Sequence, residues 1–425
     1  MNRLVSANKI EPRRRFCQRL ACAVVSFPWL SLAGCRSPQQ PAPAELPGDA
    51  SWDEVLALAR GKTVQLAMWD GDPLINRYMR DSIAAAVRRE YRMELQVAGM
   101  TASAFVQRIL VELEAGRTVG DIDVAWINGE SFYQLRQLDA LYGPFTSRLP
   151  HRQYIDWQNP FIAKDFQQPI EGYECPWGNV QLTLIHHSER VTEPPRTSTE
   201  LESWVAAHPG RFTFDQSFTG MTFLKCLLID FAGGREALTG PFDEPKYQQA
   251  AQKLWDYLRR LRPNLWRRGK TFPENVTQLH QLFANSEVDF TMSNNDGEVD
   301  NKVLQGVLPE ASRAYVLTTG TIRNSHYLGI PRTAPHKAAA LVLINHLISP
   351  AAQWQKAQTA TWGDGTILDI DRLPPPWPER FATIEGRTRV PPRRELDPYA
   401  LEEPAPEIMI RLYDDFRREM IDRDS

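Results

Sequence analysis

The chain alternates between two hydrophobic patterns, one with a period of two residues and one with a period close to 3.6. Short apolar stretches of the first kind predict strands at residues 63–68, 93–97 and 122–127. Stripes of the second kind predict helices at residues 75–87, 105–116 and 132–138. This repeated alternation predicts a parallel sheet with helices on its faces, because parallel strands need a crossover connection.

A second section of the same kind follows a predicted strand at residues 180–185. Thr199 and Glu202 have the spacing of a capping box, so we expect a helix that stops at His208-Pro209-Gly210. Further strands are predicted at residues 211–215 and 288–292, and further helices at residues 220–231, 254–261, 335–348 and 408–416. The order of elements predicts the fold class α/β, with the elements divided between two lobes.

Length and composition agree with two soluble lobes. The chain has 425 residues, more than one ordinary domain, and its 42% hydrophobic and 24% charged residues are typical of globular proteins. Residues 1–35 hold six Lys or Arg and one acidic residue, which leaves 43 basic and 51 acidic side chains for the rest. An acidic body argues against nucleic acid as a partner.

The N-terminus has the pattern of an export signal. Basic residues precede an apolar run at residues 20–33, which is too short to span a bilayer comfortably. The ending Leu32-Ala33-Gly34-Cys35 resembles the lipobox of bacterial lipoproteins, which implies lipidation of Cys35 and an anchor in the membrane. Arg13-Arg14-Arg15-Phe16 resembles a twin-arginine motif, although Cys17 and the residue after it depart from that pattern. The alternative is a cleaved signal in which Cys35 is incidental.

Two further features concern the segment after the signal and the remaining cysteines. Residues 36–50 contain four prolines and no apolar periodicity, which predicts an extended tether.

Outside the signal and Cys35, the cysteines are Cys175 and Cys226. They could form a disulfide in an oxidising compartment, or Cys226 could be a buried thiol on a helix.

Several stretches together resemble the extracellular solute-binding proteins of ABC importers. The longest runs from Gly329-Ile330-Pro331-Arg332 to Ser349-Pro350-Ala351-Ala352-Gln353, and two others lie at residues 178–185 and 123–130. Residues 60–370 are similar in order and spacing to the branch with maltose-, iron-, thiamine- and polyamine-binding members. The resemblance implies a two-lobed periplasmic-binding-protein type II fold with hinge strands, a solute in the cleft, and delivery to a membrane permease with its ATPase.

On that basis we divide the chain into a signal (1–35), a tether (36–50) and two lobes. Lobe 1 is assigned residues 51–187 and 291–325, and lobe 2 is assigned residues 188–290 and 326–425. The chain should cross between lobes near His186-His187, near Thr291-Met292 and near Asn324 to Gly329. Neighbouring histidines on a strand point to opposite faces, so we expect no metal there, and no cofactor.

Loops at the carboxyl ends of strands are where α/β sheets bind ligands. This rule selects candidate ligand-binding residues after the strands of both lobes and before the first hinge strand. They are Trp69, Asp70, Asn128, Gly129, Glu130, Trp177, Gly178, Thr219, Gly220, Asn294 and Asn295. The alternative is ordinary turn chemistry, since Asn, Asp and Gly occur in most loops.

Tryptophans next to acidic residues favour a small nitrogenous cation, such as a thiamine-like or polyamine-like solute. A helix N-terminus at Gly220 would favour an anion or a zwitterion equally. We expect no catalytic residues and no enzyme, because the motifs His-Glu-x-x-His, Cys-x-x-Cys and Gly-x-Ser-x-Gly are absent. The alternatives are an exported hydrolase using Asp121 and Asp123, or a scaffolding lipoprotein. The predicted location is the periplasm or cell envelope, with a lipid anchor.

Overall fold

We describe the protein from a computed structural model, which defines residues 46–384 and 387–422. The predicted signal at 1–35, the lipidation site Cys35 and the first ten residues of the predicted tether lie outside the described residues. Within the described ranges, no helix is both long enough and apolar enough to cross a membrane.

Lobe 1 is built on a mixed sheet whose strands follow the order β2-β1-β3-β10-β6. These strands are β1 (Thr63–Met68), β2 (Glu94–Gly99), β3 (Val124–Ile127), β6 (Glu174–Gln181) and β10 (Thr321–Gly329). The first three are parallel, and β10 runs antiparallel to both β3 and β6. The structure confirms the predicted strands near 63–68, 93–97 and 122–127 and their parallel pairing.

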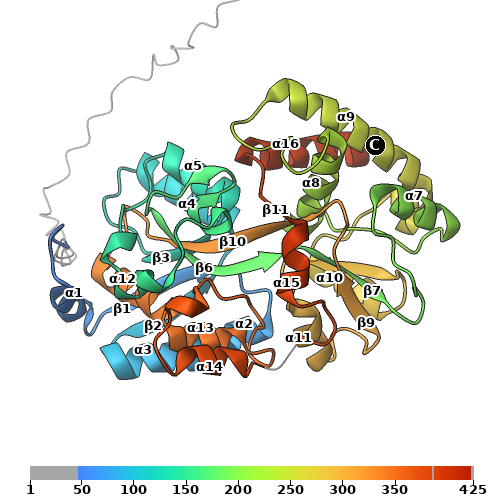
Figure 1. Ribbon diagram of the computed structural model, residues 1–425. Coiled ribbons are helices and arrows are strands. Elements are labelled where there is room, and N and C mark those ends of the chain that lie inside the picture. The colour runs from blue at the N-terminus through green and yellow to red at the C-terminus, as the bar shows by residue number, and fades with distance from the viewer. Residues whose placement is uncertain (1–45, 385–386, 423–425) are drawn as a thin grey trace, which may run out of the picture. The chain divides into compact units, whose positions relative to one another are not determined.

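Helices cover both faces of this sheet (Figure 1). On β1, Val64 and Leu66 point into one hydrophobic cluster and Ala67 points into another, as the period of two requires. One face carries α4 (Ala102–Glu114) and α5 (Gly129–Gln137). The other carries α1 (Trp52–Ala59), α2 (Pro73–Arg77), α3 (Ala84–Tyr91), α12 (Lys337–Leu347) and α13 (Pro350–Ala357).

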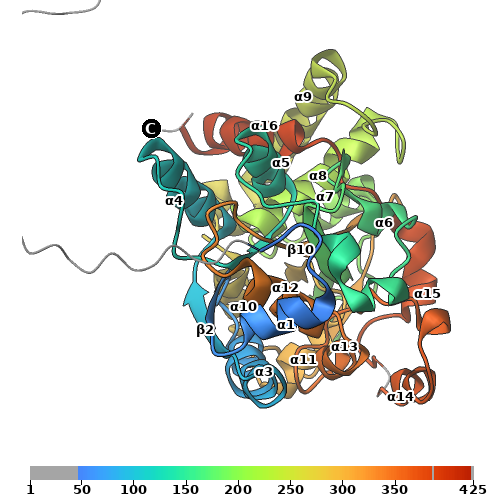
Figure 2. The ribbon, with the colours of Figure 1, turned by 90° about the vertical axis from the view of Figure 1, so that its left-hand side faces the viewer.

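Helix α12 is the central helix of lobe 1. Every residue from Ala338 to Leu347 is buried, which fits a helix that is apolar all round. It lies between the sheet and α1, and Figure 2 shows α1 directly in front of it. Ser349 caps α13, and Pro350 occupies its first position, which explains the break between the two helices.

Lobe 2 has a smaller antiparallel sheet in the order β8-β7-β9. Its strands are β7 (Thr183–His187), β8 (Phe290–Ser293) and β9 (Ser312–Tyr315). Its helices are α7 (Ser198–Ala207), α8 (Phe218–Ala232), α9 (Glu244–Leu261), α10 (Val276–Ala284), α11 (Glu298–Leu304) and α16 (Pro406–Phe416). The predicted strand at 211–215 is wrong, because this segment pairs with no strand, although Phe212 and Phe214 are buried in the lobe core.

The remaining short elements lie at the junction of the lobes or at the surface. They are α6 (Pro160–Ala163), β4 (Lys164–Asp165), β5 (Gln168–Pro169), α14 (Trp377–Ala382), α15 (Arg393–Leu396) and β11 (Ala400–Leu401). Strand β11 pairs with the beginning of β10, and β4 pairs with β5 in a two-stranded hairpin.

The packing differs from the lobe boundaries that we expected from the sequence. The chain first crosses at Gln181–Thr183, between β6 and β7, and β8 and β9 then stay with β7 in lobe 2. Residues 328–373 pack in lobe 1 with β1, whereas Val390, Leu396 and α16 pack in lobe 2. Hydrophobic periodicity predicts what each segment becomes, but not which sheet it joins.

Cys175 and Cys226 are free and lie in different hydrophobic clusters. The Cys226 thiol accepts a hydrogen bond from the backbone N–H of Ile322 at 3.3 Å. The disulfide alternative is therefore wrong, and the buried-thiol alternative is correct. Burial raises the pKa of the Cys226 thiol to about 12 and raises that of the Cys175 thiol as well.

We predict that neither thiol reacts with a labelling reagent in the folded chain at neutral pH, because both thiols are buried and protonated. Peptide mapping after labelling should find both modified only when denaturant is present. Adding a reductant should leave the unfolding midpoint unchanged. A midpoint that falls on reduction would show that the two cysteines are paired.

Candidate functional site

The two lobes contact each other where α5 of lobe 1 packs on α16 of lobe 2, and where the loop after β1 approaches α11. A buried ion pair bridges them directly: Lys302 of α11 donates to the carboxylate of Asp72, which caps α2. Glu298 lies 3.7 Å from Lys302. Burial alone would raise the pKa of Glu298, but His280, Lys302 and Ser293 lower it to about 2. This side of the interface is therefore held by ionised groups.

Trp69 and Asp70 lie at the rim of lobe 1, directly after β1. The Trp69 side chain is 39% exposed, and its ring covers Gly71, where a Cβ would lie 2.3 Å from the ring. The Asp70 carboxylate covers the end of β2, since a Cβ on Gly99 would lie 2.0 Å from its Oδ2. Both predicted residues are thus accessible at the carboxyl edge of the sheet.

Asn128, Gly129 and Glu130 form the beginning of α5, with Asn128 as the N-cap. The backbone N–H of Gly129 donates to the carboxylate of Asp165 in β4. Gly129 has φ +47°, and a Cβ there would lie 2.5 Å from the Phe166 ring, so only glycine fits. This loop therefore depends on the β4–β5 hairpin for its position.

Thr219, Gly220, Asn294 and Asn295 lie together on lobe 2. Asn294 donates from Nδ2 to the Thr219 hydroxyl at 3.0 Å, which joins the end of β8 to the first turn of α8. A Cβ on Gly220 would lie 1.6 Å from the backbone oxygen of Asp215, so the helix start and the preceding loop are in close contact. Asn295 accepts from the backbone N–H of Gly297 and closes a turn.

Trp177 and Gly178 differ from the other predicted site residues. Trp177 is fully buried, and its ring packs edge-to-face against Trp126 and Trp362 at centroid distances of 5.2 Å. A Cβ on Gly178 would lie 2.1 Å from His326 Nε2. Both residues therefore pack inside lobe 1, on a strand that is buried along its whole length.

A buried charge cluster lies near the junction of the lobes, around the β4–β5 hairpin and Lys225 of α8. Its members are the carboxylates of Glu130, Asp165, Glu174 and Glu403 and the ammonium of Lys225. Lys225 Nζ lies 2.5 Å from a Glu403 oxygen, and both side chains are almost wholly removed from solvent. Burial raises the pKa of all four carboxyl groups, and the Lys225 charge opposes that shift at Glu130, Asp165 and Glu403.

Several buried carboxylate oxygens at this interface have no hydrogen-bond partner. They are both oxygens of Glu174, Oε2 of Glu130 and Oδ2 of Asp215. Glu130 belongs to lobe 1 and Asp215 to lobe 2, and both charges, together with burial, raise the pKa of Tyr413 on α16. The cluster therefore has more acidic groups than Lys225 can neutralise.

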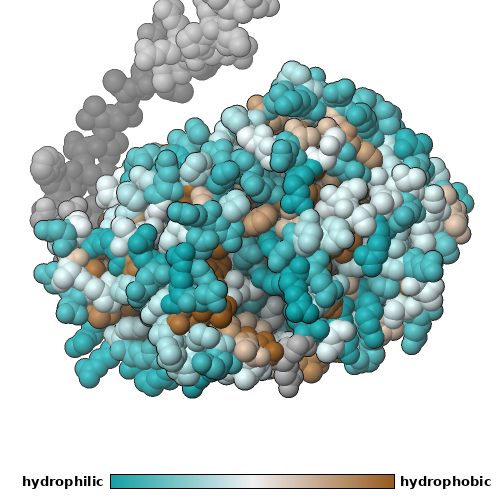
Figure 3. Space-filling view, in the orientation of Figure 1, coloured by the Kyte–Doolittle hydropathy of each residue, from teal (hydrophilic) through white to brown (hydrophobic). Residues whose placement is uncertain are grey.

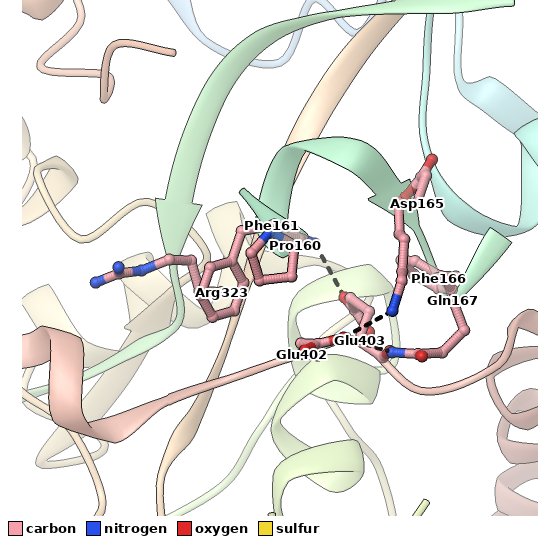
Figure 4. A pocket seen from close by; sticks show the side chains of 10 residues that line it. Pro160, Phe161, Asp165, Phe166, Gln167, Arg323, Glu402 and Glu403 are labelled. Atoms are coloured by element: carbon pink, nitrogen blue, oxygen red, sulfur yellow. Dashed lines mark hydrogen bonds and ion pairs between the residues drawn. The ribbon is translucent and has the colours of Figure 1, made fainter. Parts of the chain in front are cut away.

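A pocket opens beside this cluster (Figure 4). Its volume is about 250 Å³, including open space at the mouth. The walls come from the β4–β5 hairpin, from the beginning of β10 and from the segment after β11. The lining residues are Pro160, Phe161, Lys164, Asp165, Phe166, Gln167, Arg323, Asn324, Glu402 and Glu403. Both lobes thus contribute to the pocket, together with the hinge strand that joins them.

A further buried carboxylate, that of Asp296, joins several segments at the hinge between the lobes. Asp296, just after β8, accepts from Arg387 at 2.6 Å, from Arg393 at 2.9 Å and from the backbone N–H of Gln181 at 3.0 Å. Burial would raise the pKa of Asp296, but the two guanidinium groups keep it below its ordinary value. Arg393 also donates to the backbone oxygen of Asn179, so the C-terminal segment is tied to β6.

The residues considered for catalysis or metal binding have structural roles. Asp121 pairs with Arg108 and Arg117 at the surface. Asp123 is fully buried and accepts from the backbone N–H groups of Gln65 and His336. Among residues 46–384 and 387–422, no group of three or more His, Cys, Asp or Glu is arranged to hold a metal.

Sequence reasoning missed the buried charged residues near the junction of the lobes, among them Asp165, Lys225, Lys302 and Glu403. A weak signal exists for Lys225, because it interrupts the apolar stretch of α8, and a lysine there must find a buried partner. No signal in the sequence identifies that partner as Glu403, which is 178 residues away.

Comparison with known proteins agrees with this architecture. Residues 82–376 match the family described as bacterial extracellular solute-binding protein. Protein YnjB of Escherichia coli (strain K12) is 36% identical over 329 residues, which is 76% of this chain and 84% of that one.

Two solved structures illustrate the fold. A putative spermidine/putrescine ABC transporter protein from Listeria monocytogenes is 17% identical, with a TM-score of 0.57 over 84% of this chain and 98% of that one. The periplasmic binding protein AfuA from Actinobacillus pleuropneumoniae, with fructose-6-phosphate bound, is 12% identical. Its TM-score is 0.59 over 84% of this chain and 98% of that one. The shared architecture is the periplasmic-binding-protein type II fold. The family match and the two-lobed structure together show that this chain belongs to the bacterial extracellular solute-binding proteins.

Proposed function

We propose that the protein is the substrate-binding component of an ABC-type importer. It captures a small solute between its lobes and delivers it to a membrane permease and its ATPase. The family supports solute binding outside the cytoplasm, and the fold supports capture between two lobes. Ligand contacts that form only on closure favour the closed state, so no covalent chemistry is needed.

The solute is proposed to be a nitrogenous cation, of a thiamine-like or polyamine-like kind. The observation that carries this proposal is the excess of buried carboxylates at the interface, with free oxygens on Glu130 and Asp215 from opposite lobes. An unpaired carboxylate is costly in a low-dielectric site, and a cationic group between the lobes would offset that cost. The fold alone does not decide the solute class, since similar structures include a putative spermidine/putrescine transporter protein and a binding protein with fructose-6-phosphate bound.

The proposed solute contacts are residues that border the interface, of which Trp69 and Asp70 are exposed and the others are partly or fully buried in this arrangement. On lobe 1 these are Trp69, Asp70, Asn128 and the loop Gly129–Glu130, and on lobe 2 they are Thr219, Gly220, Asn294 and Asn295. Glu130 and Asp215 would bind the cationic group, and the Trp69 ring would cover an apolar or cationic part of the solute. Trp177 and Gly178 are not included, because they are enclosed within lobe 1.

Neither alternative function has a supporting observation. Asp121 and Asp123 are engaged in structural contacts, which removes the pair suggested for a hydrolase. A scaffold needs a large exposed apolar surface. Most of the face drawn in Figure 3 is hydrophilic, with hydrophobic residues only in small patches. Helix α16 packs with Ile408, Met409 and Leu412 into the lobe 2 core and is not available as an adhesive surface.

The main test is thermal unfolding of the purified chain, stripped of bound ligand by refolding, against a panel of solutes. The panel contains thiamine and its phosphates, polyamines, amino acids, sugars, sulfate, phosphate and ferric chelates. A solute at 100 times its dissociation constant adds about 2.7 kcal/mol to the free energy of unfolding, and we expect this for an organic cation. A shift with an anion alone would overturn the cation assignment, and silence across the panel would argue against the receptor function.

The variant Glu130→Gln provides the residue-level control. Loss of a charged hydrogen bond costs about 1.5–3 kcal/mol, so cation affinity should fall roughly 10- to 100-fold. Glu114→Gln removes the same charge from the exposed end of α4 and should bind like the parent chain. Equal affinities for the parent and Glu130→Gln would exclude Glu130 from the site.

The raised pKa values of the cluster predict a pH dependence of stability. A carboxyl group whose pKa is higher in the folded state than in the unfolded chain stabilises the fold fully below its unfolded pKa. That contribution is lost as the pH rises through the folded pKa. Glu174→Gln cannot ionise, so it should raise the unfolding midpoint at pH ~8 by about 2–4 °C relative to the parent, and by less at pH ~5. Glu114→Gln should change neither midpoint.

Lipid anchoring through Cys35 gives a separate prediction. The full chain, expressed in a bacterial host that processes lipoproteins, should partition into a non-ionic detergent phase, and Cys35→Ser should partition into the aqueous phase. Cys22→Ser, within the predicted signal, is the matched control and should behave like the parent. Detergent partitioning that survives in Cys35→Ser would rule out this anchor.

A further inference from the structure

The hairpin formed by β4 and β5 belongs to one lobe by its base and to the other by its tip. At the base, Ile170 packs in a lobe 1 cluster, and Tyr327 of β10 donates from its hydroxyl to the backbone oxygen of Lys164 at 3.0 Å. At the tip, the Phe166 side chain is 1% exposed and packs in the lobe 2 core. A lobe 1 segment therefore fills a position in the core of lobe 2.

The aromatic contact at the tip is supported by the buried charge cluster. Lys225 Nζ lies 4.2 Å from the centroid of the Phe166 ring, a distance typical of a cation–π contact. The same ammonium pairs with Glu403 and lies 5.6 Å from the centroid of the Phe218 ring, so Phe166 is the nearer of its two aromatic neighbours. Both Phe166 and Lys225 are inaccessible to water in this arrangement.

Gln167 adds polar contacts from the same turn to the same lobe. Its Nε2 donates to Glu402 Oε2 at 3.1 Å and to the backbone oxygen of Glu403 at 2.8 Å. Its Oε1 accepts from the backbone N–H of Gly240 at 3.3 Å. Figure 4 shows Gln167 pointing toward Glu402 and Glu403, with dashed lines between them.

The turn conformation presents both side chains to lobe 2. Phe166 has φ +43° and Gln167 has φ +62°, the left-handed values that a two-residue type I′ hairpin requires at both central positions. Neither residue is the Asn or Gly that such turns favour, so the turn keeps side chains that cost backbone strain. Contacts with lobe 2 offset that cost.

The hairpin is also attached to the loop that begins α5. Asp165 accepts from the Gly129 backbone N–H, and the Phe166 ring packs on the Gly129 backbone. If the lobes separate, the Phe166 ring leaves an apolar core and Lys225 keeps only the more distant Phe218 ring, at 5.6 Å. The Gly129–Glu130 loop is then held by a hairpin that has lost its contacts with lobe 2. Opening therefore acts on the loop that carries a proposed solute contact.

We propose that the β4–β5 hairpin is an interlobe clasp, in which Phe166 is the positioning residue that holds the lobes closed and fixes the Gly129–Glu130 loop. The clasp stabilises the closed arrangement before any solute binds. It rests on the two-lobed closure of the proposed function, but not on the identity of the solute.

The test is amide hydrogen exchange of the full chain, read by mass spectrometry without added solute, together with its small-angle scattering radius. Phe166→Ala should raise exchange about tenfold or more in residues 129–133, 239–241 and 402–404, and should increase the radius. Exchange in β1 and β7 should stay at the parent level, since each lobe keeps its own sheet. Phe166→Leu should recover most of the protection, because it restores an apolar side chain.

Phe161→Ala is the matched control, because Phe161 lies on α6 at the same pocket but is not part of the lobe 2 core. It should leave exchange in the three segments unchanged. Unchanged exchange and radius in Phe166→Ala would overturn the clasp. So would a rise spread evenly through both lobes at constant radius, which indicates general destabilisation.

If Phe166→Ala does not fold, Gln167→Ala decides the question, since it removes only the polar contacts at the tip. It should raise exchange in residues 239–241 and 402–404 by a smaller factor, and unchanged exchange there would overturn the clasp. Because no solute is present, these results are independent of the thermal-unfolding panel. A negative panel with a positive exchange result would retain the clasp and would count against the proposed receptor function and its solute.

Discussion

Buried charge at the junction of the lobes is the constraint on which the rest of this structure depends. An ionised group taken out of water needs a partner close by. Here several partners come from another part of the chain: Lys225 takes Glu403, and Asp72 takes Lys302 from the opposite lobe. The Asp72–Lys302 pair therefore holds the closed arrangement by charge, in addition to apolar packing, whereas Lys225–Glu403 is a buried pair within lobe 2.

The two sides of the interface differ in how complete that pairing is. Around Lys302 the carboxylates have cationic neighbours, and the pKa of Glu298 falls accordingly. Around Lys225 the carboxylates of Glu130, Asp165 and Glu403 outnumber the cations, their pKa values rise, and a buried oxygen of Glu130 has no partner. A fully paired side suits a structural contact, whereas an under-neutralised side suits an exchangeable cation. The β4–β5 hairpin adds an apolar contact on that second side, where charge pairing alone is insufficient.

The sequence predicted much of lobe 1 but not the course of the chain through the hinge. The strands at 63–68 and 122–127 were predictable because local periodicity reflects burial on each face of a sheet. The lobe of residues 328–373 was not, because α12 is apolar on all sides and would suit either core. Trp177 was selected for its place before a strand, yet that strand is covered on both faces.

What the sequence determined by itself is therefore the set of elements, the α/β class, the family and the loops that flank the interface. These depend on short-range periodicity, turn residues and motif order, all of which can be read along the chain. The tertiary structure alone decided which partners the buried charges find, for example the Gly129 backbone N–H for Asp165 and Glu403 for Lys225. Such contacts join residues far apart in sequence, and the energy of a charge depends on burial and neighbours that exist only once the chain has folded.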